Sequence, residues 1–202
     1  MSVKPLRSTY QLKVTLLNIE PLIWRRLHLP NDLFLEDVHY ILQDAMGWQN
    51  CHLHQFISDK RFFGMVDDDM GMDLNTEDET EYRLCQLLKN EKDAMVYEYD
   101  FGNGWEHKIV LEKILPYTAK APIAQCIQGE RACPPEDCGG SWRYPHLLSI
   151  LQDPAHDEHE EMLAWVGEAF DPDVYDIENT NALLAEGFCK NRTEDNAVDV
   201  VH

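Results

Sequence analysis

The sequence of 202 residues predicts an α+β fold, in which a mixed β-sheet with a β-grasp-like N-terminal part is followed by a C-terminal helical cap. Three observations support this class. Apolar residues alternate with polar ones in segments 9–18 and 95–115, as in strands that bury one face. Apolar residues recur at helical spacing in segment 35–46, and helix-like stripes follow residue 144.

The first three predicted elements are a hairpin and a helix. A strand is predicted over 9–18, and its apolar side is formed by Tyr10, Leu12, Val14 and Leu16. Segment 23–29 predicts a second strand, so that the two strands form a hairpin. Segment 35–46 predicts a helix with one apolar stripe, and Gly47 is a typical residue to end it.

The middle of the chain predicts shorter elements. Segment 54–57 predicts a short strand, and segment 61–64 predicts a further strand or a turn. Segment 65–82 holds eight acids and no base, which indicates a solvated loop, and segment 82–88 predicts a short helical turn.

Segments 95–101 and 106–115 predict a second hairpin, which turns at residues 102–104. Residues 9–101 thus have the order strand, strand, helix, strand, short helix, strand. This is the order of a β-grasp unit, in which the last strand pairs beside the first. Three helices are predicted after this hairpin, over 145–151, 157–169 and 177–186.

The length suits a single domain, which we place at residues 1–190. Within it we expect a sheet-rich part, a loop rich in cysteine and proline, and a helical cap, at 9–115, 116–142 and 143–190. Residues 191–202 are polar and predict a flexible tail.

The charge is unevenly distributed. Residues 1–64 hold seven Lys or Arg and six Asp or Glu, a net charge of +1, whereas residues 65–202 hold ten and thirty-one, a net charge of −21. Because DNA binding needs cations that neutralise phosphates, we expect no direct nucleic-acid binding and a protein partner with a basic surface.

The sequence shows no run of about 18 apolar residues and no signal peptide, so we expect no membrane span, a cytoplasmic location and cysteines without disulfides.

Cys126, Cys133 and Cys138 lie close together in the loop 116–142 and predict a zinc site. Zinc usually takes four ligands, and the histidines eligible as the fourth are His107, His52 and His54. Residues two apart in a strand point the same way, so the last two histidines can also bind one ion together. The alternative is that the three thiols are small buried hydrophobic groups in a packed loop.

A second group of candidate binding residues surrounds the predicted hairpin turn. It comprises Tyr99, Asp100, Trp105 and His107, together with Glu136 and Asp137 before the last loop cysteine. Asp100 and His107 flank the turn, where a hydrogen bond between them would make an oriented base or a ligand pair. The alternative is a structural turn, in which Trp105 merely covers the core.

Six blocks of the sequence together resemble the plasmid pRiA4b ORF-3-like family, whose members are also labelled TnpR-type passenger proteins of insertion elements. These blocks are PLIWRRLHLP, LEDVHYILQDAMGW, HLHQF, YEYDFGNGWEH, GERACPPEDCGG and DPAHDEHEEM, the last followed by FDP. The resemblance runs from Tyr10 to Leu184. It implies a bacterial or archaeal cytosolic α+β protein, carried on plasmids or transposons, without an established activity. Asn103 stands where the family pattern has Asp, and a cysteine like Cys138 is not part of every version.

We therefore expect an uncharacterised plasmid- or transposon-associated cytosolic protein that acts as a non-enzymatic protein-interaction module. One alternative is a metal-dependent zinc enzyme that uses the cysteine loop and His107, with Asp100 as the orienting group or base. A further alternative is an accessory factor in mobile-element DNA recombination. The sequence has no Walker A, GxGxxG or GxSxG motif and no serine among several arginines, so it indicates no familiar catalytic class.

Overall fold

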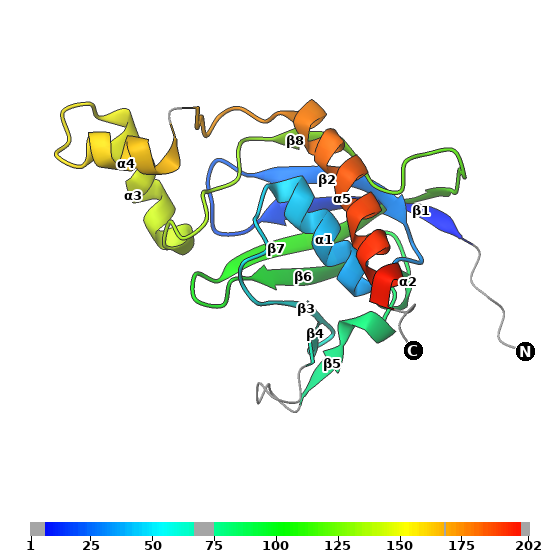
Figure 1. Ribbon diagram of the computed structural model, residues 1–202. Helices are drawn as coiled ribbons and strands as arrows, with labels where there is room; N and C mark the ends of the chain where they lie inside the picture. The colour runs from blue at the N-terminus through cyan, green and yellow to red at the C-terminus, as the bar shows by residue number, and fades with distance from the viewer. Residues whose placement is uncertain (1–6, 67–74, 168, 199–202) are drawn as a thin grey trace, which may run out of the picture.

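The computed structural model describes residues 7–66, 75–167 and 169–198, which form a β-sheet with flanking helices (Figure 1). The described strands are β1 (Ser8–Leu16), β2 (Trp24–Pro30), β3 (His54–Ser58), β4 (Arg61–Gly64), β5 (Thr76–Asp78), β6 (Ala94–Tyr99), β7 (Trp105–Pro116) and β8 (Gln125–Glu130). The described helices are α1 (Leu35–Met46), the 3-10 helix η1 (Glu79–Glu81), α2 (Leu84–Leu87), α3 (Gly140–Gln152), α4 (His159–Val166) and α5 (Ile177–Val198).

The sheet has the strand order β5-β4-β3-β6-β7-β1-β2-β8. β4 and β5 are parallel and the other neighbours are antiparallel, so the predicted α+β class with a mixed sheet is confirmed. The β-grasp-like order of elements is present, but the strand that lies beside the first one here is not the last strand of that series. β6 pairs with β3 and β7, and β7 lies beside β1, because β6 and β7 form a hairpin whose second strand takes that place.

Helices α1 and α5 lie along one face of the sheet (Figure 1). The alternating side chains that point to this face are buried, among them Leu12, Val14, Leu27, Ile109 and Leu111. The predicted apolar stripe of α1 faces the same core, since its six members are buried: Leu35, Val38, Ile41, Leu42, Ala45 and Met46. As predicted, α1 ends at Gly47, whose φ of 98° lies in the left-handed region.

Three segments differ from the sequence prediction. β8 lies inside the loop predicted over 116–142 and adds an edge strand to β2. β5 and η1 lie inside the loop predicted over 65–82, of which residues 67–74 lie outside the described residues. α5 continues to Val198, so the segment predicted as a tail from residue 191 begins as helix, and residues 199–202 lie outside the described part.

Helices α3 and α4 stand to one side of the sheet, near the turn of the β6–β7 hairpin (Figure 1). At the start of α3, Gly140 has a φ of 76°, and a Cβ atom there would lie 2.5 Å from the carbonyl oxygen of Asn103. Only glycine permits this approach, which holds the residues before α3 against the hairpin turn. None of the described helices is long and apolar enough to cross a membrane.

Candidate functional site

Three loops that are distant in the sequence meet beside the turn of the β6–β7 hairpin. His52, in the loop before β3, lies at their centre. Its Nε2 atom is 3.3 Å from Oδ1 of Asp137 and 3.6 Å from Oδ2 of Asp100. The same nitrogen is 3.7 Å from Oε2 of Glu136. We call these four residues the His52 cluster; three of them were candidate binding residues, and His52 was an alternative metal ligand.

Glu136 is held in place through one of its two carboxylate oxygens. Oε1 accepts a hydrogen bond of 2.8 Å from the backbone N–H of Gln49 and one of 3.1 Å from the hydroxyl group of Tyr99. The side chain of Glu136 is only 10% exposed, and its second oxygen, Oε2, has no hydrogen-bond partner among the described residues. The two bonds therefore aim a buried oxygen at the imidazole of His52.

Tyr99 connects two of the three loops. Its hydroxyl oxygen accepts a hydrogen bond of 3.0 Å from the backbone N–H of Cys51 while it donates to Glu136. Burial raises the pKa of Tyr99 above its ordinary value, so the phenol stays protonated and remains a donor. Tyr99, a predicted candidate, thus positions Glu136.

Asp100 is oriented by the turn that it begins. Its φ of 57° is left-handed, and Oδ1 accepts hydrogen bonds from the backbone N–H groups of Gly102 and Asn103. Oδ2 accepts a bond of 2.6 Å from the side-chain amide of Asn103, and the same oxygen faces His52. Asn103 is therefore a residue that positions the carboxylate of Asp100.

The cluster concentrates negative charge. Within the described residues, no Lys or Arg forms an ion pair with Asp100, Glu136 or Asp137. Asp100 and Glu136 are almost buried, whereas the side chain of Asp137 is 69% exposed. Nε2 of His52 is buried and lacks a hydrogen-bond partner among the described residues. The site is thus closed on one side and open to solvent at Asp137.

The donor atoms fit a divalent metal ion. The ligand atoms of His52, Asp100 and Asp137 all lie within 4.8 Å of one another, and so do those of Cys51, His52 and Glu136. An imidazole nitrogen with carboxylate oxygens suits Zn²⁺ or Mn²⁺, and a thiolate ligand would favour Zn²⁺. Sequence reasoning missed Cys51, although its position next to a candidate histidine was a usable signal.

His107 and Trp105 do not lie in the His52 cluster. Both point from β7 toward the core and are fully buried. The indole N–H of Trp48 donates to Nε2 of His107, at 3.3 Å, and Nδ1 of His107 lies 3.3 Å from the carbonyl oxygen of Tyr97. Burial lowers the pKa of His107 to about 4, so it is a neutral core histidine, and the hydrogen bond expected between it and Asp100 is not formed.

The three loop thiols also lie elsewhere. Sγ of Cys126 contacts the hydroxyl group of Tyr175 at 3.0 Å and the carbonyl oxygen of Gln128 at 3.4 Å. Burial raises the pKa of Cys133 and raises that of Cys138 to about 12, which disfavours the thiolate that zinc requires. Among the described residues, these thiols and His107 do not form a group of three or more close ligand atoms.

His54 belongs to a buried polar pair, apart from His52. Its Nε2 atom lies 2.9 Å from the carboxylate of Glu79, and its ring stacks on His39 with 3.5 Å between centroids. Both members of the pair are almost completely buried. The structure therefore directs the two histidines of the HLH motif to different carboxylates.

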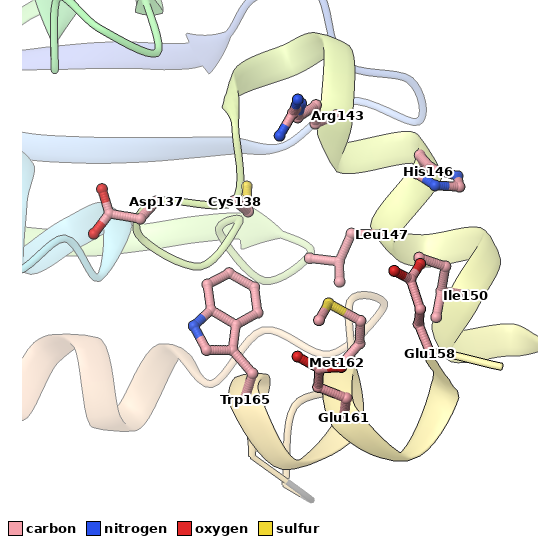
Figure 2. Close-up of a pocket in the computed structure, with 10 residues that line it drawn as sticks. All are labelled: Asp137, Cys138, Arg143, His146, Leu147, Ile150, Glu158, Glu161, Met162 and Trp165. Carbon is pink, nitrogen blue, oxygen red and sulfur yellow. The ribbon is translucent and has the colours of Figure 1, made fainter. Parts of the chain in front are cut away.

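A pocket of about 570 Å³ opens between α3 and α4 (Figure 2). Its apolar wall is formed by Leu147, Ile150, Met162 and Trp165. Asp137 lines the pocket as well as the His52 cluster, so the two sites are adjacent. A pocket of this volume is within the range that holds small ligands or single side chains of a partner.

Comparison with known proteins places the chain among proteins that have no assigned activity. The model of the family described as plasmid pRiA4b ORF-3-like protein matches residues 8–179. The uncharacterised protein y4hQ of Sinorhizobium fredii is 38% identical over 165 residues, which cover 79% of this chain and 81% of y4hQ. The crystal structure of MM3350, a protein of unknown function from Methanosarcina mazei Go1, is similar with a TM-score of 0.77 and 34% identity, over 86% of this chain and 98% of that one.

Proposed function

The chain belongs to the plasmid pRiA4b ORF-3-like family, and we propose that it functions through a divalent metal ion bound at the His52 cluster. The main support is a pair of buried polar atoms that face each other, Nε2 of His52 and Oε2 of Glu136. Neither atom has a hydrogen-bond partner among the described residues. A buried polar atom without a partner costs about 1–3 kcal/mol, and a metal ion would bind both atoms at once.

Electrostatics favours the same proposal. Three carboxylates converge on one imidazole, and their mutual repulsion is offset by no guanidinium or ammonium group that pairs with them in the described part of the chain. A dication at this point would neutralise most of that charge. The hydrogen bonds to Glu136 and Asp100 would then act as the outer shell that orients metal ligands.

The open side of the cluster supports a chemical role. Asp137 is exposed, so a metal ion held by the buried ligands would keep a position for water. A bound divalent ion acts as a Lewis acid and lowers the pKa of its water, which supports metal-assisted hydrolysis. The zinc enzyme, which was the alternative reading of the sequence, is thus retained as a proposal, with the His52 cluster in place of the cysteine loop.

Isothermal titration calorimetry of the metal-free protein with Zn²⁺ and with Mn²⁺ tests this proposal. We expect one ion per chain for at least one of the two metals. Glu136→Gln and Asp100→Asn should each weaken its binding by about tenfold or more, because each removes a carboxylate charge at nearly constant shape. Absence of binding by the wild-type protein would contradict the proposal.

Two control variants separate the candidate sites. Glu178→Gln removes an exposed acid at the start of α5 and should leave metal affinity unchanged. Cys138→Ser removes a thiol of the cysteine loop and should also leave it unchanged. Loss of binding in Cys138→Ser, with full binding in Glu136→Gln, would instead support a zinc site in the cysteine loop.

As a second function, we propose that the chain binds a basic partner protein. The sequence has eleven acids and no Lys or Arg between Arg143 and Lys190, and this field attracts cationic partners. Fluorescence anisotropy tests the proposal with a pentapeptide that alternates lysine and leucine, and with a counterpart in which glutamate replaces lysine. The basic peptide should bind and the acidic one should not; equal affinity for both would contradict the proposal.

A further inference from the structure

We infer that the pocket between α3 and α4 is the docking site for this basic partner, and that one lysine or arginine side chain of the partner enters it. The inference rests on the interaction proposed above and does not depend on a bound metal. The occupant is a protein segment that carries both basic and apolar residues. Three features of the pocket support this choice: its wall, its charge and its exposure.

The wall of the pocket suits the aliphatic stem of a long basic side chain. Leu147 and Ile150 of α3 face Met162 and Trp165 of α4 across the cavity (Figure 2). Trp165 is 47% exposed, so its ring is accessible from solvent. The face of a tryptophan ring attracts a guanidinium or ammonium group through a cation–π interaction.

The charged residues of the pocket are mostly acidic. Glu158 precedes α4 and Glu161 lies in its first turn, and both line the cavity together with Asp137. Neither glutamate forms an ion pair within the described residues, so both carboxylates remain available to a cation. The one guanidinium is that of Arg143, which Figure 2 shows at the opposite side of the pocket from the two glutamates.

The surrounding surface has the same sign. Residues 140–166 contain one arginine and five acids, namely Asp153, Asp157, Glu158, Glu160 and Glu161, a net charge of −4 with histidines neutral. This charge repels phosphate-bearing ligands and steers basic segments to the pocket.

The helices that form the pocket are only partly covered by the rest of the chain. α4 has no buried residue, and Trp142 in α3 is 92% exposed. Large exposed apolar patches mark interaction sites, and tryptophan is a frequent anchor of protein interfaces. The pocket is therefore accessible to a partner without a change in the described fold.

Fluorine NMR of the full chain, labelled with fluorotryptophan and free of metal, locates the binding site. Each resonance is assigned by its loss in a Trp→Phe variant, and the same basic and acidic peptides are titrated. The basic peptide should shift the Trp165 resonance in a saturable manner, while the buried Trp105 serves as an internal reference. Raising NaCl from about 50 to about 300 mM should weaken binding several-fold, because salt screens the carboxylates.

Matched variants make the result specific. The double variant Glu158→Gln with Glu161→Gln should weaken binding by about tenfold, whereas Glu178→Gln on α5 should leave it unchanged. Both contain exposed substitutions, and circular dichroism checks that both are folded. Undiminished binding in the double variant, or no shift of Trp165, would overturn the pocket as the docking site. If the basic peptide binds but shifts other resonances, the chain binds a basic partner at another surface. If the peptide does not bind at all, both the proposed interaction and the proposed docking site are wrong.

Discussion

The hydroxyl group of Tyr99 lies 3.1 Å from Oε1 of Glu136, and the hydrogen bond that it donates turns the other carboxylate oxygen toward His52. We predict that Tyr99→Phe weakens metal binding by about tenfold, because the ligand loses the partner that orients it. Isothermal titration measures the change. Tyr117→Phe, which removes an exposed hydroxyl bonded to Arg7, is the control and should bind metal as the wild-type protein does. Equal affinity in both variants would show that Tyr99 does not position Glu136.

Two buried histidines predict how stability depends on pH. Burial, with a smaller contribution from His54, lowers the pKa of His39 to about 3, and burial lowers that of His107 to about 4. Both are neutral in the fold, whereas in the unfolded chain they take up protons below about pH 6.5. The free energy of unfolding should therefore fall as pH decreases from about 6.5 to about 4, by up to about 1.4 kcal/mol per pH unit for each histidine.

The variant His39→Gln isolates one of these contributions. Glutamine can keep polar contacts with Tyr97 and Asn50, which are the hydrogen-bond partners of His39, but it does not titrate. Urea unfolding at about pH 7 and about pH 5 should show a smaller loss of stability for the variant than for the wild-type protein. An identical loss would contradict a depressed pKa of His39.

Arg25 is buried and joins the edge of the sheet to α1 and to the segment before α5. Its guanidinium donates to the carbonyl oxygens of Ala45, Trp24 and Glu130, and its centre lies 3.7 Å from the ring centroid of Tyr175. Lysine lacks the planar guanidinium group that makes these hydrogen bonds, so Arg25→Lys should lower the free energy of unfolding by about 2 kcal/mol. Urea denaturation measures this. Arg143→Lys is the control, since Arg143 is exposed, and it should leave the midpoint unchanged; equal effects would contradict the role of Arg25.

The thiols should differ strongly in reactivity. Cys51 is exposed, whereas burial raises the pKa of Cys133 and Cys138. With iodoacetamide at about pH 8, Cys51 should be alkylated in the folded protein, and Cys133 and Cys138 only after unfolding in urea. Peptide mapping by mass spectrometry distinguishes them. Alkylation of Cys133 in the folded protein as fast as that of Cys51 would contradict its burial as an inert thiol.

The elements that the sequence predicted are those with one buried and one exposed side. α1, β1, β2 and the β6–β7 hairpin have regular patterns because one side of each element is buried over most of its length. β8 was missed because it is an edge strand in which Gln125, Ile127, Gln128 and Glu130 are all exposed. Its pairing with β2 also shifts register between Arg26 and Leu27, so no simple alternation marks it.

Most residues of the candidate site could be predicted one by one from their types, but the sequence did not show that they lie together. Asp100, Glu136 and His52 were each noted in their own loops, yet their convergence depends on how α3 and β3 pack at the hairpin turn. His107 was assigned to the site because of its chemistry. Alternation along β7 could have placed it correctly, since it shares the inward face with Ile109 and Leu111.

Anomalous X-ray diffraction from crystals soaked in MnCl₂ or ZnCl₂ locates a bound metal ion without ambiguity. We expect one strong peak that lies about 2.0–2.2 Å from Nε2 of His52 and from carboxylate oxygens of Asp100 and Glu136. No peak at this position, or a peak bound instead by Cys126, Cys133 and Cys138, would contradict the proposed metal site.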